Sequence, residues 1–318
     1  MEMQLIDVHS HYITPYFRKT MNNAGQLGTD LVPIPPWNLE SYMEWMDTVG
    51  ITHSIMSASS PNQSYGDKAA ALDLTRECNE TGAEYVNKYP GRLSLAASLP
   101  LPYVEESLNE IKHAYDQLSA KAVRILSNSL GVYPGSPETE PVFEELNRRK
   151  AVVVLHPTRP QEYPADTLSS VTIPLFEFFP ETCRAVFNLI LSGTVHRYPD
   201  VKIIVPHCGA LIIPLLERIE FLFNIYAAGH EGVDKVSVLE DAATLYFDIA
   251  GNPLPRQLDT LLTFADDSHV MYGTDFPWNA TDRAKQLITD LTNRQNDGKF
   301  NDLLFTNNAL ALFPQLIN

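Results

Sequence analysis

The sequence predicts an α/β fold of the (β/α)8 TIM-barrel class, formed by a single domain over residues 1–318. Eight short apolar runs alternate along the chain with longer runs of helical periodicity, which is the pattern of a strand–helix repeat. Neither a linker nor a low-complexity tract divides the 318 residues. Residues 7–15, after the start of the first strand, include no glycine, whereas an open doubly wound sheet usually has a glycine-rich turn there. These observations favour the closed barrel over that open sheet.

The predicted strands are short runs rich in valine, isoleucine, leucine and alanine. In order they are Met3–Val8, Thr52–Ser57, Arg92–Ser98, Ala122–Leu126, Ala151–Leu155, Lys202–Pro206, Thr244–Ile249 and His269–Tyr272. The predicted helices repeat apolar residues three or four positions apart. They are Leu39–Val49, Asp67–Lys88, Val104–Leu118, Pro141–Lys150, Glu181–Ser192, Leu211–Tyr226, Pro255–Phe264, Thr281–Asn293 and a last one near Asp302–Leu312. Proline-rich stretches indicate two long loops, after the first and the fifth strands.

The composition excludes several classes of partner and compartment. The chain carries 39 acidic and 23 basic residues, and its net charge of −16 opposes binding to nucleic acid. The longest weakly polar stretch, Ile203–Leu216, is too short to cross a membrane. The start of the chain lacks the basic and apolar pattern of a signal peptide, and the three cysteines are scattered. We therefore expect a cytoplasmic protein that binds neither nucleic acid nor a membrane.

The carboxyl ends of the strands are where a barrel of this class carries its chemistry. His9 and His11 end the first strand, His156 ends the fifth, His207 the sixth and Asp275 the eighth. Because residues two apart on a strand share a face, His9 and His11 can both point at one ion in the barrel interior. A further histidine and a carboxylate would complete a set of three nitrogens and one oxygen, which suits Zn²⁺. The other histidines, at strand starts, on helices and in loops, are expected to be structural.

These residues lie in longer motifs that resemble those of the amidohydrolase superfamily. The motifs are Asp7-Val8-His9-Ser10-His11, Leu155-His156-Pro157, Glu181-Thr182-Cys183-Arg184-Ala185, Val205-Pro206-His207-Cys208-Gly209 and Tyr272-Gly273-Thr274-Asp275. Within the superfamily, essentially the whole chain resembles the branch that contains aminocarboxymuconate-semialdehyde decarboxylase and γ-resorcylate decarboxylase. The resemblance implies the metal-dependent hydrolase type of barrel.

The resemblance also implies a role for each residue at the strand ends. The implied metal ligands are His9, His11, His156 and Asp275. His207 is the implied catalytic acid or base beside the metal, and Asp275 shares in proton transfer. Members with two metal ions use a carboxylated lysine at the end of the fourth strand, where this chain reads Leu126-Ser127-Asn128. We therefore expect one divalent ion per chain, with Zn²⁺ preferred and Mn²⁺ as the alternative.

Two arginines are candidates for binding a substrate carboxylate. Arg218 lies eleven residues after His207 and matches the branch's substrate-binding arginine, which enters the active site of a neighbouring subunit. A homodimer is therefore expected, although Arg218 could instead be a solvated residue of its helix. Arg159 is the second candidate, because the first barrel helix lacks the arginine that the aminocarboxymuconate enzyme carries there. Guanidinium suits this task because it binds a carboxylate through two hydrogen bonds and stays protonated.

Two reactions fit these residues. The main hypothesis is a metal-dependent, non-oxidative decarboxylase (a carboxy-lyase) of a small unsaturated or aromatic carboxylic acid. The alternative is a hydrolase or hydratase that uses a metal-activated water on a small carbonyl substrate. A third hypothesis, an inactive barrel that only binds a ligand, is opposed by the complete set of histidines and Asp275.

The long loops also carry aromatic residues, which could form the wall of a pocket for a planar acid or could pack at an interface. They are Tyr12, Tyr16, Phe17, Trp37, Phe176, Phe178 and Phe179. Asp248, at the end of the seventh strand, could face the site or hold one of its ligands by a hydrogen bond.

Overall fold

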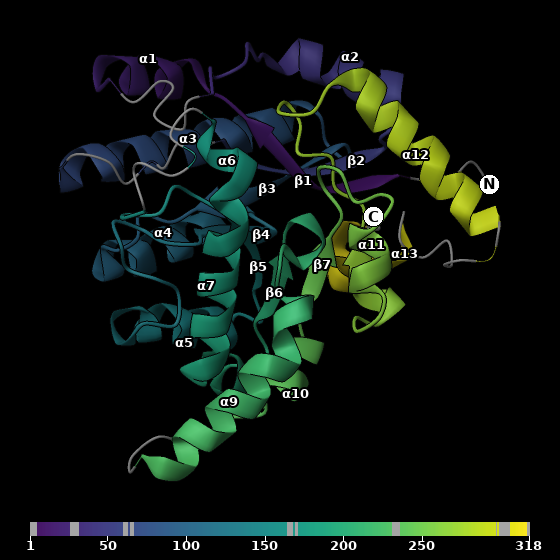
Figure 1. Ribbon diagram of the computed structural model, residues 1–318. Coiled ribbons are helices and arrows are strands. Elements are labelled where there is room, and N and C mark those ends of the chain that lie inside the picture. Colours follow the sequence, from purple (N-terminus) through teal and green to yellow (C-terminus); the bar gives the residue numbers. More distant parts are fainter. Residues whose placement is uncertain are drawn as a thin grey trace.

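The computed structural model describes residues 5–25, 32–59, 63, 67–163, 168, 171–230, 236–296, 298 and 306–316. Its strands form one sheet, in the order β1 to β8, in which every neighbouring pair is parallel. They are β1 (Ile6–Tyr12), β2 (His53–Ala58), β3 (Leu93–Ser98), β4 (Ala122–Leu126), β5 (Val152–His156), β6 (Lys202–Val205), β7 (Tyr246–Asp248) and β8 (Val270–Met271). Figure 1 shows helices packed around the outside of this sheet.

The segment that follows β8 closes the sheet onto β1. The backbone nitrogen of Val8 donates to the carbonyl of Tyr272 at 3.0 Å, and that of His11 donates to the carbonyl of Phe276 at 2.7 Å. Ser10 and Phe276 form a parallel bridge between the same two segments. An open doubly wound sheet would leave these two edges apart, so the predicted (β/α)8 barrel is confirmed.

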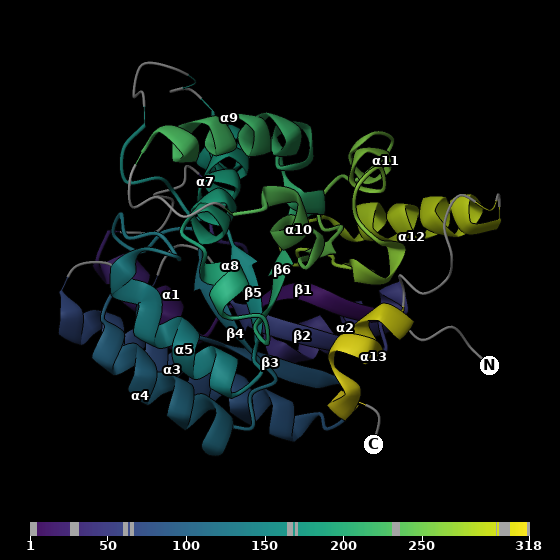
Figure 2. The same cartoon turned by 90° about the horizontal axis from the view of Figure 1, so that it is seen from below.

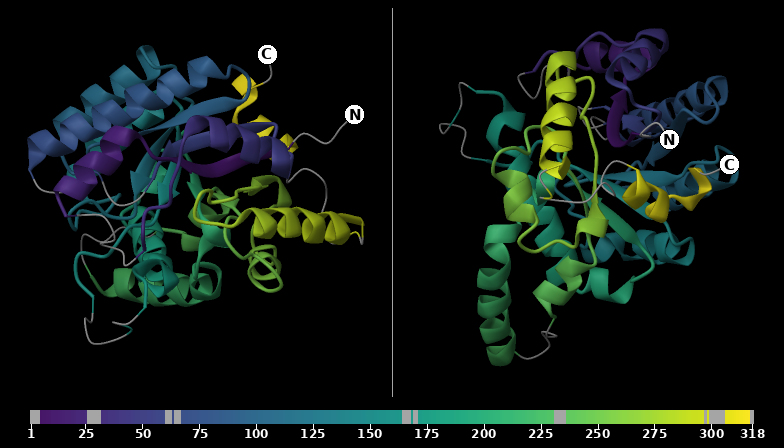
Figure 3. Two further views of the ribbon diagram at one scale, coloured as in Figure 1. Left: turned by 90° about the horizontal axis from the view of Figure 1, so that it is seen from above. Right: turned by 90° about the vertical axis from the view of Figure 1, so that its right-hand side faces the viewer.

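The helices that surround the barrel are α1 (Pro15–Asn23), α2 (Leu39–Val49), α3 (Lys68–Lys88), α4 (Val104–Asp116), α5 (Glu140–Arg148), α6 (Ile173–Phe176), α7 (Phe178–Leu191), α8 (Thr194–Arg197), α9 (Leu216–Gly229), α10 (Val238–Ala243), α11 (Gln257–Leu261), α12 (Thr281–Asn296) and α13 (Asn307–Leu312). Figure 2 shows the strands at the centre of this ring of helices. Figures 1 and 3 show that α9 extends beyond the body of the barrel.

Local signals explain why the best-predicted helices begin and end where they do. The side chain of Asn38 accepts a hydrogen bond from the backbone of Ser41, which caps the start of α2, and Gly50 ends that helix with a φ of 89°. The side chain of Asp67 caps α3 in the same way. The predicted helix Leu39–Val49 therefore matches α2, and Asp67–Lys88 differs from α3 only by its capping residue.

Two faces of the strands have different apolar partners. One set of side chains packs under the helices, and the other fills the barrel interior, as alternation along a strand requires. The interior cluster is formed by Ile6, Val8, Ile55, Ala96, Ala122, Val152, Val154, Ile204, Met271, Ala309 and Phe313. Ala309 belongs to α13 and Phe313 directly follows this helix, whose Asn308 donates to the carbonyl of Val270 at the start of β8. This helix therefore covers the amino end of the strands, and the carboxyl end is the one left for polar side chains.

Several predicted boundaries are wrong. The first strand was expected to end at Val8, but β1 continues to Tyr12, because the polar residues of its second half line the barrel mouth. Helices α1, α6, α8 and α10 were not predicted. The start of α1 carries a recognisable signal, since Thr14 caps it and Pro15 occupies its first position. Part of the helix expected near Asp302–Leu312 lies outside the described residues.

No helix among the described residues has both the length and the apolar character that crossing a membrane would require.

Candidate metal centre

A bulge in β1 brings His9 and His11 into the barrel interior. The pairing of β1 with β2 shifts between Asp7 and Ser10, so β1 holds one more residue than β2 over this stretch. Val8 therefore faces the interior core below, and the two histidines face the space above it. Both imidazoles are buried, and their Nε2 atoms lie 3.2 Å apart. Two nitrogens bound to one tetrahedral ion would be separated by about 3.3 Å, given bonds of about 2.0–2.1 Å.

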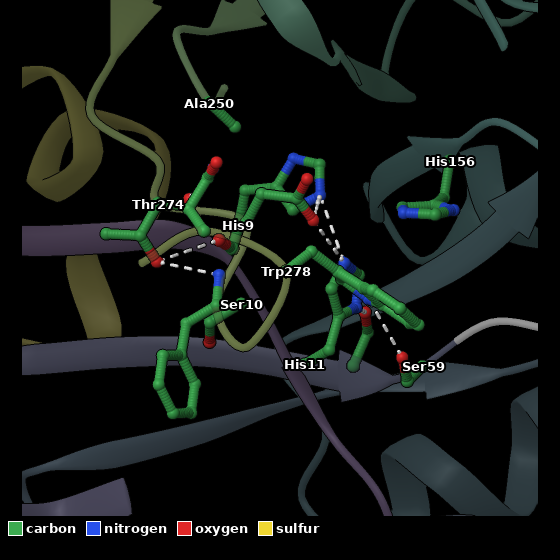
Figure 4. A network of polar contacts seen from close by, with 12 residues as sticks. His9, Ser10, His11, Ser59, His156, Ala250, Thr274 and Trp278 are labelled. Carbon is green, nitrogen blue, oxygen red and sulfur yellow. Dashed lines mark hydrogen bonds and ion pairs between the residues drawn. The ribbon is translucent and has the colours of Figure 1, made fainter. Parts of the chain in front are cut away.

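His156 and Asp275 complete this group. His156 ends β5, and Asp275 follows β8 with a φ of 60°. Four possible ligand atoms lie within 4.8 Å of one another. Each comes from a different side chain: His9, His11, His156 and Asp275. An Oδ1 atom of Asp275 lies 3.2 Å from Nε2 of His11 and 3.5 Å from Nε2 of His9. Figure 4 shows His9, His11 and His156 gathered around this space. The four side chains can therefore hold a metal ion.

The second nitrogen of each imidazole has an oxygen partner. Nδ1 of His9 lies 2.8 Å from a carboxylate oxygen of Asp248, and Nδ1 of His156 donates to the carbonyl of Pro157 at 2.7 Å. Nδ1 of His11 lies 3.1 Å from the hydroxyl of Ser57. These contacts favour a proton on each Nδ1 and leave Nε2 free to bind a metal, which is the arrangement that metal-binding histidines use.

Burial and the neighbouring charges set the charge states of the group. Burial lowers the pKa of His9, but the carboxylates of Asp248 and Asp275 together outweigh burial and raise this pKa well above its ordinary value. Burial lowers the pKa of His11 to about 4 and holds that of His156 well below its ordinary value. Burial raises the pKa of Asp275, yet hydrogen bonds from histidines hold this pKa well below its usual range. A metal ion would therefore meet an ionised carboxylate and two neutral imidazoles, and would displace a proton from the third.

Asp7 and Gly273 fix the backbone around the group. The Asp7 carboxylate accepts from the backbone nitrogens of His9 and Thr274, each at 3.0 Å, and from the Thr274 hydroxyl at 2.5 Å. It thereby ties β1 to the segment that carries Asp275. A Cβ atom on Gly273 would lie 2.9 Å from Cβ of His9, so only glycine fits at this position.

His207 lies beside the group, on a turn that follows β6. Its φ of 56° is in the left-handed region, and its backbone nitrogen donates to Asp248 at 3.1 Å. Its Nε2 lies 3.7 Å from Oδ2 of Asp275, and its ring stacks on Phe179 with centroids 6.0 Å apart. Its Nδ1 is buried and has no hydrogen-bond partner among the described residues. The imidazole is therefore positioned beside Asp275 with one nitrogen still available.

Five of the seven aromatic residues predicted on the long loops fall into two groups, and the other two, Tyr16 and Phe176, are exposed. Phe178 lies edge-on to His156 with centroids 6.3 Å apart, and Phe179 stacks on His207, so these two border the site. Tyr12 and Phe17 are fully buried in the core, and Trp37 packs against Tyr12. The pocket-wall hypothesis therefore fits Phe178 and Phe179, which begin α7 after β5, and simple packing describes Tyr12, Phe17 and Trp37. Of the two roles considered for Asp248, the structure shows the hydrogen-bonding one: its carboxylate contacts His9 and the backbone of His207.

Among the residues that the structure describes, no hydrogen bond or ion pair joins either of the arginines predicted to bind substrate to the histidine group. Arg159 is exposed, and its guanidinium donates to the Tyr163 hydroxyl at 2.9 Å. Arg218 is exposed on α9. Their proposed roles stay predictions.

Several residues near the group were not predicted from the sequence. Ser57 orients His11, and the indole nitrogen of Trp278 donates to Ser59 at 3.1 Å in the same region (Figure 4). Arg124 is buried on β4. Serine and tryptophan at strand ends carry no distinctive sequence signal, and Arg124 lies in mid-strand. Only the alternation of Ala122, Arg124 and Leu126 could have indicated that this arginine faces inward.

Comparisons with known proteins identify the family of the chain. The chain matches the family model described as Amidohydrolase over residues 6–315. It is 32% identical over 320 residues to 6-methylsalicylic acid decarboxylase acuB of Aspergillus aculeatus. The aligned region covers 98% of this chain and 96% of the relative. A crystal structure of an amidohydrolase II, 33% identical, has a TM-score of 0.89 and covers 98% of this chain and 100% of its own.

A more distant structure shares the fold. It is a dihydroxybenzoic acid decarboxylase from Polaromonas sp. JS666 with bound manganese and 2-nitroresorcinol. Its sequence is 22% identical, its TM-score is 0.82, and the match covers 98% of this chain and 97% of that one. The family, and the branch with decarboxylase members, that the sequence motifs indicated are confirmed. The chain belongs to the amidohydrolase family.

Proposed function

We propose that this chain is a metal-dependent, non-oxidative decarboxylase of a small aromatic or unsaturated carboxylic acid. The observation that carries the proposal is the buried group of three imidazoles and Asp275, with His207 beside it, at the carboxyl end of the barrel. Full-length relatives named as decarboxylases favour decarboxylation over the hydrolase or hydratase alternative.

The proposed metal ligands are His9, His11, His156 and Asp275. Three imidazole nitrogens and one carboxylate oxygen suit Zn²⁺, and the structural relative with bound manganese keeps Mn²⁺ as the alternative. A divalent ion bound here supplies a Lewis acid that polarises a substrate oxygen. Elemental analysis of purified protein should find about one divalent ion per chain.

His207 and Asp275 are the proposed proton carriers. Decarboxylation of an aromatic acid replaces the carbon–carbon bond to the carboxylate with a carbon–hydrogen bond, so one proton enters the ring as CO₂ leaves. The Nε2 atom of His207 and Oδ2 of Asp275 are 3.7 Å apart, so a substrate atom bound beside them can exchange a proton with either group. Phe179 covers the His207 ring and helps to exclude water from this proton.

The test is CO₂ release by the metal-loaded protein from a panel of hydroxybenzoic and unsaturated acids. Wild type should release CO₂ from at least one of them, and His207→Ala should reduce this rate by about a hundredfold or more while keeping the metal. Turnover of esters, lactones or amides alone would instead support the hydrolase alternative.

We also propose that the protein is a homodimer in which Arg218 of one subunit serves the active site of the other. Helix α9 carries Arg218, and most of its surface has no partner within the described chain. Phe221 is 66% exposed and Ile225 56% exposed, and both line a groove with Leu239. A second copy that covers this apolar face would also bring Arg218 into a neighbouring subunit.

A cytoplasmic location is proposed on the state of the cysteines. Cys78, Cys183 and Cys208 are all buried and free. Free buried thiols are typical of proteins of a reducing compartment.

A further inference from the structure

Arg124 lies on the interior face of β4. Its side chain is only 3% exposed. Ala122, two residues earlier, belongs to the interior cluster, and residues two apart on a strand share a face. In the sheet, Arg124 pairs with Ser98 of β3 and with Val154 of β5. The guanidinium therefore occupies the inside of the barrel.

Its contacts place the guanidinium at the same end of the barrel as the metal centre. Nη2 donates to the hydroxyl of Ser98, the last residue of β3, at 3.2 Å, and to the side-chain oxygen of Gln63, which follows β2. Burial is the main cause of the low pKa of His11 and His156, and the positive charge of Arg124 adds to it. The arginine thus acts electrostatically on two residues of the centre.

Arg124 has no counter-charge in the part of the chain that the structure describes. No carboxylate forms an ion pair with it there, and its Nε has no hydrogen-bond acceptor. The amide nitrogen of Gln63 is a second buried donor without an acceptor. Burial lowers the pKa of Arg124 to about 10, so the group remains charged near neutral pH. A buried cation with two unsatisfied donors beside it is unfavourable unless an anion joins it.

We propose that Arg124, with Gln63, binds the carboxylate of the substrate within the same subunit. This inference rests on the proposed function, since it assigns an anchor for that acid. A carboxylate supplies the missing negative charge and acceptor oxygens for Nε of Arg124 and Nε2 of Gln63. Exposed Arg159 offers no comparable site, because it lies in water and already donates to Tyr163.

The test compares ligands that differ only in charge. Binding of 2-hydroxybenzoate and of the neutral 2-hydroxybenzamide to the metal-loaded protein is measured by calorimetry for wild type, Arg124→Met and Arg124→Lys. Arg148→Met, at an exposed arginine on α5, is the matched control. Arg124→Met should weaken binding of the acid by about 10- to 100-fold and leave binding of the amide nearly unchanged. Arg124→Lys keeps the charge but loses the planar fork, so its loss should be smaller.

Thermal melting separates anchoring from a structural role. Removing a buried charge without a partner should leave the melting temperature of metal-loaded Arg124→Met equal to or above that of wild type. An equal loss of affinity for both ligands with a lower melting temperature would make Arg124 a structural residue and overturn the proposal. Unchanged acid binding would overturn it as well. Failure of wild type to release CO₂ from any acid, with the binding difference intact, would refute the decarboxylase but not the anchor.

Discussion

The carboxylate of Asp248 holds His9 and the backbone of His207 at the same time. One oxygen lies 2.8 Å from Nδ1 of His9, and the other accepts from the backbone nitrogens of His207 and Ala250 at 3.1 and 3.0 Å. Asp248 is fully buried, which raises its pKa, but the charge of His9 together with the hydrogen bonds from His9 and Ala250 outweighs burial and lowers this pKa. One ionised side chain from β7 therefore sets both the tautomer of His9 and the position of His207.

Asp248→Asn should reduce metal affinity by about 10- to 100-fold. Its amide can offer an N–H to Nδ1 of His9, which would favour the proton on Nε2 and block the atom that faces the metal. The measurement is competition with a chelator, followed by metal analysis. Asp290→Asn, at a half-buried position of α12 where the carboxylate accepts from Gln286, is the matched control and should bind metal as wild type does. Unaltered affinity in Asp248→Asn would show that this carboxylate does not orient a ligand.

Gly273→Ala should also impair the metal centre, through packing rather than charge. The added methyl group would lie 2.9 Å from Cβ of His9 and 3.3 Å from Cβ of Asp248, so β1 or β7 must shift. Such overpacking typically costs about 1–3 kcal/mol of the free energy of unfolding. Metal content and urea unfolding would measure both effects. Gly229→Ala, where a Cβ meets no atom within 4 Å, is the control and should change neither.

The sequence could predict the histidines and Asp275 because their positions follow from strand alternation and strand ends. His9 and His11 are two positions apart and do share the barrel interior. Their placement also needs the bulge between Asp7 and Ser10, and no residue of that segment signals a bulge. The roles of these residues as ligands, and the single domain over residues 1–318, stay predictions.

Arg124 shows why the rest of the site could not be predicted. The chemistry of a barrel is expected at the strand ends, and Arg124 lies in the middle of β4. The long side chain carries its charge from there to the mouth of the barrel, next to Ser98 and Gln63. The absence of a nearby carboxylate among the described residues is a property of the folded chain. It is this property, and not the residue type, that distinguishes Arg124 from arginines such as Arg148, which pairs with Glu145.

Phe313→Ala should destabilise the fold without altering the centre. The ring is fully buried in the interior cluster beneath Val8 and Ile6. Truncating a buried phenylalanine costs about 3–5 kcal/mol of the free energy of unfolding. Urea unfolding measures this loss, and metal content measured in parallel should be unchanged because α13 lies at the opposite end of the barrel. A variant of full stability would show that α13 does not close the interior.

Acid should destabilise the protein partly through His53, which lies at the start of β2. Burial lowers its pKa below the ordinary value of 6.5, and its nitrogens lie near the carbonyl of Gly91 and the hydroxyl of Ser94. The unfolded chain therefore binds this proton at a higher pH than the folded chain does. Stability due to His53 is present above about pH 6.5 and is lost as the pH falls toward the folded pKa, by at most about 1.4 kcal/mol per pH unit.

His53→Gln should reduce that acid sensitivity, because glutamine carries no titrating proton. The free energy of unfolding is measured with urea at about pH 7.5 and about pH 5.5, with chelator present. The difference between the two pH values should be smaller for His53→Gln than for wild type. His230→Gln, at an exposed position, is the control and should behave as wild type does. An equal difference in all three proteins would contradict the assignment.

Arg218 can be tested by complementation between two inactive variants. His207→Ala and Arg218→Met are co-expressed, so that half of the dimers are mixed. In a mixed dimer, one active site has both His207 and the partner's Arg218, and the other has neither.

If Arg218 acts across the interface, the mixture should recover about one quarter of the wild-type rate, since half of the dimers have one of two sites intact. Each variant alone should remain inactive. No recovery would place Arg218 in the site of its own subunit, and an active Arg218→Met variant would place it outside the reaction. Combining Phe221→Glu with Ile225→Glu on α9 should separate the subunits and abolish the recovery, which size-exclusion chromatography can confirm against the 35.6 kDa mass of one chain.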